Sequence, residues 1–114
     1  MLAVGEHLWG SVDDQVRRMT CGLAGGVGSS QQELCGTVSG GALIIGALYG
    51  RTSADEDDAP CNERVSAYRE RFIEHFGMIR CSDLRESGYG SEGQWPCSVL
   101  VEQATRLLLE TLAD

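Results

Sequence analysis

The feature that most constrains the fold is a run of apolar side chains at helical spacing in the middle of the chain. Its members recur every three or four residues, at Leu34, Val38, Ala42, Ile45 and Leu48 or Tyr49. This spacing predicts an amphipathic α-helix that buries one face. Ser30-Gln-Gln-Glu33 in front of the run is a capping-box pattern, and Gly50 behind it suits a helix end.

Helical signals recur along the rest of the chain. They predict a helix over residues 1–9 and a second one from the capping-box pattern at Ser11 to about residue 21. A third helix is expected over 61–76 with a stop at Gly77, and one short helical turn over 81–86. Pro96 suits the first position of a last helix. Loops are expected over 22–30, 52–60 and 87–95. Since no segment alternates like a β-strand, the sequence predicts an all-α fold: a small helical bundle of about four to five helices in a single domain, residues 1–114.

Charge and composition exclude several classes of function. The net charge is −8, the nine basic residues are scattered, and there is no lysine. A nucleic-acid partner is therefore not expected, and lysine-based nucleophiles are excluded. No apolar stretch is long enough to span a membrane, and no signal peptide is recognisable at the start, so a cytoplasmic location is expected.

Five cysteines are many for a chain of 114 residues. Without a secretion signal, they point to reduced, catalytic or metal-bound thiols rather than to structural disulfides. Cys35, Cys81 and Cys97 are predicted to lie at or near helix starts, where partial positive charge favours the thiolate. No CxxC motif is present. For Cys21 and Cys61 we expect a packing role, since cysteine is also a small hydrophobe.

Glycines interrupt the central helix at positions that invite close contact. Gly36, Gly40 and Gly41 each cost about 1 kcal/mol relative to alanine inside a helix. Gly36 and Gly40 are four residues apart and therefore share one face. We expect another backbone, or a cofactor, to approach the helix at these two glycines.

Several segments together resemble the C_GCAxxG_C_C family of putative redox-active proteins. In chain order they are Gly25-Gly26-Val-Gly28, Cys35-Gly-Thr-Val-Ser-Gly40, Phe72-Ile-Glu-His-Phe-Gly77, Cys81-Ser-Asp-Leu84 and Cys97. The resemblance covers nearly the whole chain and implies a small helical protein with a redox role. By position it assigns Cys35, Gly36 and Gly40 to the family's glycine motif, and Cys81 and Cys97 to its two later cysteines. The similar architecture of split-Soret cytochromes implies electron transfer as an alternative.

Two positions depart from the family pattern. Thr37 stands where the family usually has alanine. The family's first cysteine normally lies in an N-terminal helix, and the start of that helix is expected to be missing from this chain. Cys21 is a conceivable substitute for the absent cysteine.

Three hypotheses for function remain open at this point. The first is dithiol/disulfide redox chemistry with an unknown partner, in which Cys35, Cys81 and Cys97 include a reactive pair. The second is a metal site in which these thiolates hold zinc or an iron–sulfur cluster, because soft thiolates suit both. The third is a non-catalytic helical module. A homodimer is expected, since a shortened first helix would leave apolar surface for a partner to cover.

Overall fold

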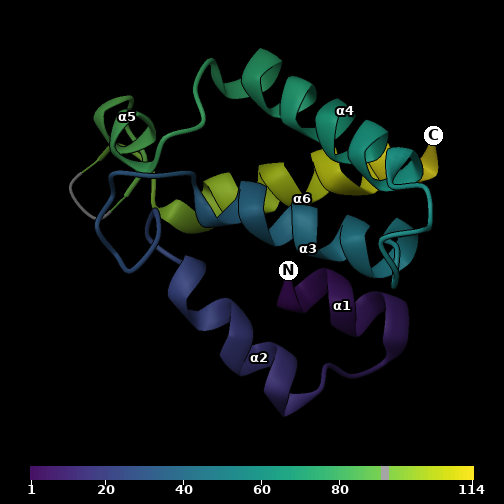
Figure 1. Ribbon diagram of the computed structural model, residues 1–114. Helices are drawn as coiled ribbons and strands as arrows, with labels where there is room; N and C mark the ends of the chain where they lie inside the picture. The colour runs from purple at the N-terminus through teal and green to yellow at the C-terminus, as the bar shows by residue number, and fades with distance from the viewer. Residues whose placement is uncertain (91–92) are drawn as a thin grey trace.

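The computed structural model describes residues 1–90 and 93–114 (Figure 1). The predicted loop over 87–95 therefore lies partly outside the described residues. Within them the chain forms six α-helices, one 3₁₀-helix and no strand, which confirms the all-α prediction. The elements are α1 (Leu2–Trp9), α2 (Asp14–Thr20), η1 (Cys21–Leu23), α3 (Gly36–Tyr49), α4 (Ala59–Phe76), α5 (Cys81–Glu86) and α6 (Cys97–Ala113).

Three long helices form the body of the bundle. Figure 1 shows α4 above α3, with α6 beside both, and each of the three contacts the other two. The helices α1 and α2 lie on the other side of α3, and α5 stands at the end of the body where α3 and α6 begin. This arrangement brings the starts of α3, α5 and α6 together at one end of the molecule.

The core lies between α3, α4 and α6. Its largest fully buried side chains are those of Tyr68, Phe72, Ile44, Ile45 and Leu84. The ring of Tyr68 rests directly on α3 at Gly41, where any added Cβ would overlap it. Gly41 therefore fixes how closely α3 and α4 approach each other. Leu43 and Leu48 of α3 remain exposed.

The start of α3 differs from the prediction. The helix begins at Gly36 with Cys35 as its N-cap, not at the Ser30–Glu33 capping box. The preceding segment has a left-handed backbone at several positions, including Gly26 and Gln31, and Leu34 forms an antiparallel bridge with Arg80. These tertiary contacts of the segment prevail over the local capping pattern, and Leu34 lies outside the helix.

Three other helix starts are shifted by one or two residues, and one of them is that of α4, which begins at Ala59 rather than at residue 61. The N-cap of α2 is Asp13, whose carboxylate accepts a hydrogen bond from the Gln15 N–H at 2.8 Å, so the predicted cap at Ser11 is wrong. Pro96 is the N-cap of α6 and Cys97 its first residue, one position later than expected. The short helix α5 and the stop of α4 at Gly77, which is left-handed, are as predicted.

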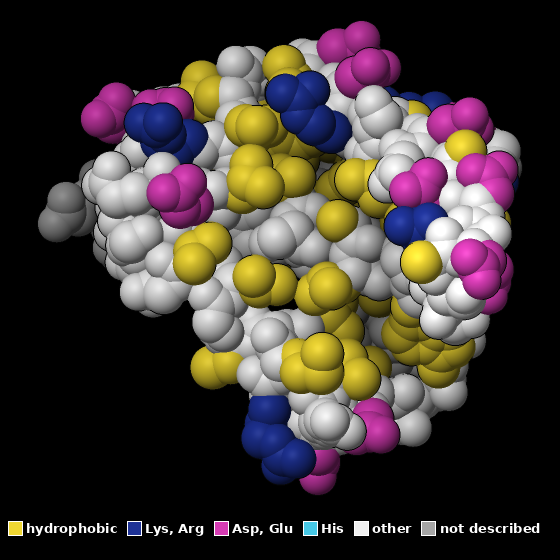
Figure 2. Space-filling view, viewed as in Figure 1, with side chains coloured by type: hydrophobic (Ala, Val, Ile, Leu, Met, Phe, Trp, Pro, Cys, Tyr) yellow, Lys and Arg dark blue, Asp and Glu magenta, His cyan; other side chains and the backbone are white. Residues whose placement is uncertain are grey.

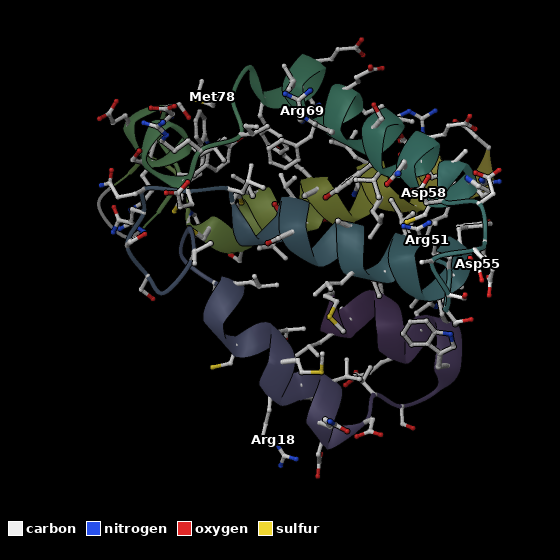
Figure 3. All side chains as sticks on the ribbon, viewed as in Figure 1. Arg18, Arg51, Asp55, Asp58, Arg69 and Met78 are labelled. Atoms are coloured by element: carbon white, nitrogen blue, oxygen red, sulfur yellow. The ribbon has the colours of Figure 1, made fainter. Side chains whose placement is uncertain are left out.

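The surface carries scattered charges. Figure 3 shows Arg51 and Asp58 close together after α3, where Nη2 and Oδ2 are 3.8 Å apart, and Arg18 pointing away from the rest of the molecule. Among the described helices, none is both long enough and apolar enough to cross a membrane.

Candidate functional site

Two backbone hydrogen bonds join the segment before α3 to the segment before α5 and position two of the predicted cysteines. The Cys35 N–H donates to the Ile79 carbonyl at 2.8 Å, and the Cys81 N–H donates to the Glu33 carbonyl at 2.9 Å. These bonds flank the antiparallel bridge between Leu34 and Arg80. In such a ladder Cys35 and Cys81 are diagonal neighbours on one face, a separation of about 7–8 Å between Cα atoms. Residues 46 positions apart in sequence are thereby placed side by side.

Cys35 is half-buried against the core just before α3 and has one polar side-chain neighbour. Its Sγ is 3.0 Å from the Thr37 Oγ1, and either atom can be the donor. The Thr37 carbonyl in turn accepts a hydrogen bond from the Tyr68 hydroxyl at 2.8 Å. Burial raises the pKa of Tyr68, and the charge of a nearby Cys35 thiolate raises it further. The first turn of α3 is therefore tied to α4 directly behind Cys35.

Cys81 is the central thiol of the group. Burial raises its pKa, and the neighbouring charges of Cys35 and Cys97 add to the effect, whereas Arg85 lowers it. Its Cβ packs against Gly26, which is buried and has φ +71°, and an added Cβ there would stand 2.6 Å from the Cys81 Cβ. The glycine-rich segment thus passes close to Cys81 because position 26 carries no side chain.

Cys97 is exposed and is the first residue of α6. Its position follows from Pro96, which is the N-cap and has φ −66° and ψ 155°. Cys97 is the thiol of the three that is most open to molecules from solution.

All three thiols line one cavity of about 330 Å³. Its walls come from the starts of α1, α3 and α6, from the end of α2, from η1 and from α5. Most of the remaining lining is apolar, with Leu2, Leu23, Leu84, Leu100 and Val101 among its members. Figure 2 shows hydrophobic side chains gathered along the hollow between α1–α2 and the helices above them. The volume is at the lower end of small-molecule sites, which span about 300–1,000 Å³.

The two glycines predicted as close-approach positions also line this cavity. A Cβ on Gly36 would stand 3.2 Å from the Leu23 carbonyl oxygen, and one on Gly40 would stand 3.2 Å from the Met1 Cβ. Their close neighbours are thus η1 and the start of α1. Gly36 and Gly40 let the chain fold tightly around the cavity, and a role in binding a cofactor stays a prediction.

Sequence reasoning missed two side chains of the cavity wall. Arg85 lies one turn after Cys81 on α5, and its i, i+4 spacing from a predicted site cysteine was the available signal. Tyr89 follows α5 and is held by Phe76 on one side and Trp95 on the other, with ring centroids 5.8 and 5.4 Å away. No local pattern identifies Tyr89, because only tertiary packing places it at the cavity.

The remaining cysteines do not line the cavity. Cys21 is exposed, although Thr20 and Leu23 on either side of it contribute to the wall, so it does not replace a missing site cysteine in this arrangement. Cys61 packs against the core from α4, as expected of a small hydrophobe. His75 is exposed and contacts the Phe76 ring, away from the three thiols.

The thiols are gathered but not bonded. Every cysteine is free, and no two stand at disulfide distance. Within residues 1–90 and 93–114, no group of three His, Cys, Asp or Glu side chains is close enough to hold a metal ion. Structural zinc takes four such ligands at about 2.0–2.3 Å. A metal site at Cys35, Cys81 and Cys97 stays a prediction.

Comparison with known proteins gives one match. The model of the family C_GCAxxG_C_C, described as "Putative redox-active protein (C_GCAxxG_C_C)", matches residues 1–111. Searches of the curated proteins and of the solved structures found no match. The family model spans nearly the whole chain, including all three cysteines of the cavity. This chain therefore belongs to the C_GCAxxG_C_C family of putative redox-active proteins.

Proposed function

We propose that the protein exchanges two electrons with a small disulfide or dithiol through Cys35, Cys81 and Cys97. The observation that carries the proposal is the shared cavity: three thiols from three separate elements line it, whereas Cys21 and Cys61 do not. Membership of a redox-active family agrees with this chemistry.

The exposed Cys97 begins the reaction in the oxidising direction. Its thiolate attacks one sulfur of a small disulfide, which forms a mixed disulfide and releases the other sulfur as a thiol that takes up the proton lost by Cys97. Cys81 then attacks the Cys97 sulfur, forming the protein disulfide and releasing the second substrate thiol with the proton of Cys81. The protein loses two electrons and two protons, and the substrate gains them.

Cys81 suits the second step because the charges of both other cavity thiols act on it. Its raised pKa keeps it a neutral thiol while the exposed Cys97 reacts first with the substrate disulfide. Cys35, its diagonal neighbour across the Leu34–Arg80 bridge, is the alternative partner for Cys81. Either disulfide requires Cα atoms within about 7 Å, so the starts of α5 and of α3 or α6 must move closer as the bond forms.

The test is a thiol count on the oxidised protein. Anaerobically reduced protein is treated with 2-hydroxyethyl disulfide, and free thiols are titrated under denaturing conditions. We expect a fall from five thiols to three, with an intact mass lower by two hydrogen atoms. In Cys81→Ser the intramolecular disulfide should be lost and a mixed disulfide with the reagent should accumulate.

Cys21→Ser and Cys61→Ser are the matched controls, because these residues do not line the cavity. Each control should still lose two thiols on oxidation. If wild-type protein forms no intramolecular disulfide, or Cys81→Ser forms one as readily as wild type, the proposal is wrong. A stable fold with unreactive thiols would instead favour the helical interaction module.

A further inference from the structure

Arg85 supplies a charge at a cavity that is otherwise mostly apolar. It lies one turn after Cys81 in α5, and both residues line the cavity. Among the lining side chains of the described residues, that of Arg85 is the only charged one. A partly buried guanidinium beside apolar walls binds an anion more strongly than one in water, because screening by water is reduced.

The Arg85 guanidinium lies against the backbone at Gly90. A Cβ added at Gly90 would stand 3.1 Å from the Arg85 Cζ and 3.2 Å from its Nη1. Gly90 has φ +116°, and its N–H donates to the Trp95 carbonyl at 2.8 Å. The guanidinium therefore rests against a glycine whose position is fixed by a turn.

Arg85 also borders a second, more polar hollow, which Gln31, Ser82, Glu86, Tyr89 and Gly93 complete. The guanidinium thus stands at the boundary between the apolar cavity and a polar surface region.

We infer that the cavity takes a compact dithiol or disulfide whose apolar chain ends in a carboxylate, and that Arg85 binds this carboxylate. The inference rests on the proposed function, since it names the substrate class for the same three thiols. The sulfur atoms meet Cys97 and Cys81, the chain lies against Leu84 and Leu100, and the planar guanidinium matches a carboxylate in a charge-assisted pair.

The reaction balances in the reducing direction as well. One thiolate of the substrate attacks the protein disulfide, and the released protein sulfur takes up a proton. The second substrate thiol attacks its own mixed disulfide, which closes the substrate disulfide and frees the other protein thiol. The carboxylate takes no part in electron transfer, so charge recognition and chemistry can be measured separately.

The probes are dihydrolipoate and dihydrolipoamide, which share the dithiol and the apolar chain and differ in the terminal charge. Protein is first oxidised with 2-hydroxyethyl disulfide, and the second-order rate constant of its reduction by each probe is then measured. We expect dihydrolipoate to react about tenfold faster or more, the size of one charge-assisted hydrogen bond.

Substitutions separate recognition from an effect on Cys81. In Arg85→Gln the ratio of the two rate constants should fall to about one, whereas Arg85→Lys should keep part of it. An influence of Arg85 on Cys81 alters both rate constants alike and cancels in the ratio. Arg106→Gln is the control, because Arg106 is exposed on α6 and paired with Glu102 at 3.0 Å; it should leave the ratio unchanged.

Each outcome decides one part of the inference. Equal rate constants for the two probes on wild-type protein would overturn the substrate class, although the proposed function would stand. A preference that survives in Arg85→Gln would overturn the assignment of Arg85. If 2-hydroxyethyl disulfide produces no protein disulfide at all, the proposed function fails first and the inference fails with it.

Discussion

The Thr37 hydroxyl lies 3.0 Å from the Cys35 sulfur, within hydrogen-bond distance. A thiolate sulfur can only accept a hydrogen bond, so the hydroxyl is the donor whenever this sulfur carries no proton. The family usually has alanine at this position, which cannot form such a bond. Thr37 is therefore positioned to adjust the reactivity of one of the proposed redox thiols.

Replacing Thr37 should change the reactivity of Cys35 more than the fold. In Thr37→Ala, alkylation of Cys35 by iodoacetamide at neutral pH should slow by about two- to tenfold, as expected for one net hydrogen bond. Thr37→Ser keeps the hydroxyl and should retain the wild-type rate. Mass spectrometry of each cysteine after timed alkylation gives the rates, and equal rates in all three proteins would contradict the prediction.

Cys81 should become reactive only at a higher pH than an ordinary cysteine thiol. Burial and the charge of Cys35 raise its pKa, so its thiolate forms at higher pH than that of an ordinary cysteine. Arg85 lowers this pKa, and Arg85→Gln should therefore delay the reaction of Cys81 further. The measurement is the alkylation rate of each cysteine between about pH 7 and 10, a range around the ordinary thiol value. Faster alkylation of Cys81 in Arg85→Gln would contradict this assignment.

Tyr68 should make the stability of the fold sensitive to alkaline pH. Burial raises its folded-state pKa above the unfolded value of about 10, so its contribution is complete below about pH 10 and is lost as the pH rises through the folded value. Tyr68→Phe should lower the free energy of unfolding at pH 7 by about 0.5–1.5 kcal/mol, because the bond to the Thr37 carbonyl is lost. Above pH 10 its stability should fall less steeply than that of wild type.

Tyr49→Phe is the control for this experiment. Tyr49 lies at the end of α3, where its ring stacks 3.8 Å from the Arg64 guanidinium carbon, and no hydrogen bond to Thr37 depends on it. Urea unfolding at several pH values should show the alkaline dependence unchanged in Tyr49→Phe. Identical pH profiles for Tyr68→Phe and wild type would show that Tyr68 does not titrate as the structure implies.

Two glycines of α3 should respond to alanine in opposite directions. At Gly41 the new methyl group would overlap the Tyr68 ring, and such overpacking costs about 1–3 kcal/mol. At Gly46 an added Cβ meets nothing within 4 Å, so Gly46→Ala should stabilise the helix by up to about 1 kcal/mol. Thermal unfolding monitored by circular dichroism measures both changes. A stabilising Gly41→Ala would be inconsistent with this packing.

The sequence predicts the helices better than their first residues. Apolar spacing identifies α3, α4 and α6 because these helices bury continuous faces. The capping boxes at Ser11 and Ser30 mislead, since Asp13 caps α2 and the Leu34–Arg80 bridge replaces the first predicted turn of α3. Residues other than glycine that adopt a left-handed backbone, such as Val27 and Gln31, cannot be recognised from the sequence.

The candidate site was likewise predictable only in part. Cys35, Cys81 and Cys97 were selected from their positions at predicted helix starts, and the fold brings those starts to one cavity. Their chemistry stays a prediction. The i, i+4 spacing from Cys81 was the available signal for Arg85, whereas Tyr89 could not be assigned to the same wall, because its approach depends on packing against Phe76.

The bridge between Leu34 and Arg80 has a thermodynamic consequence for the thiols beside it. By holding Cys35 and Cys81 as neighbours, it raises the effective concentration of one thiol at the other far above that in an unfolded chain. A disulfide between them would therefore be harder to reduce in the folded protein than after unfolding. By the same linkage, forming that bond would strengthen the fold, so the redox state and the folding equilibrium of this small bundle are coupled.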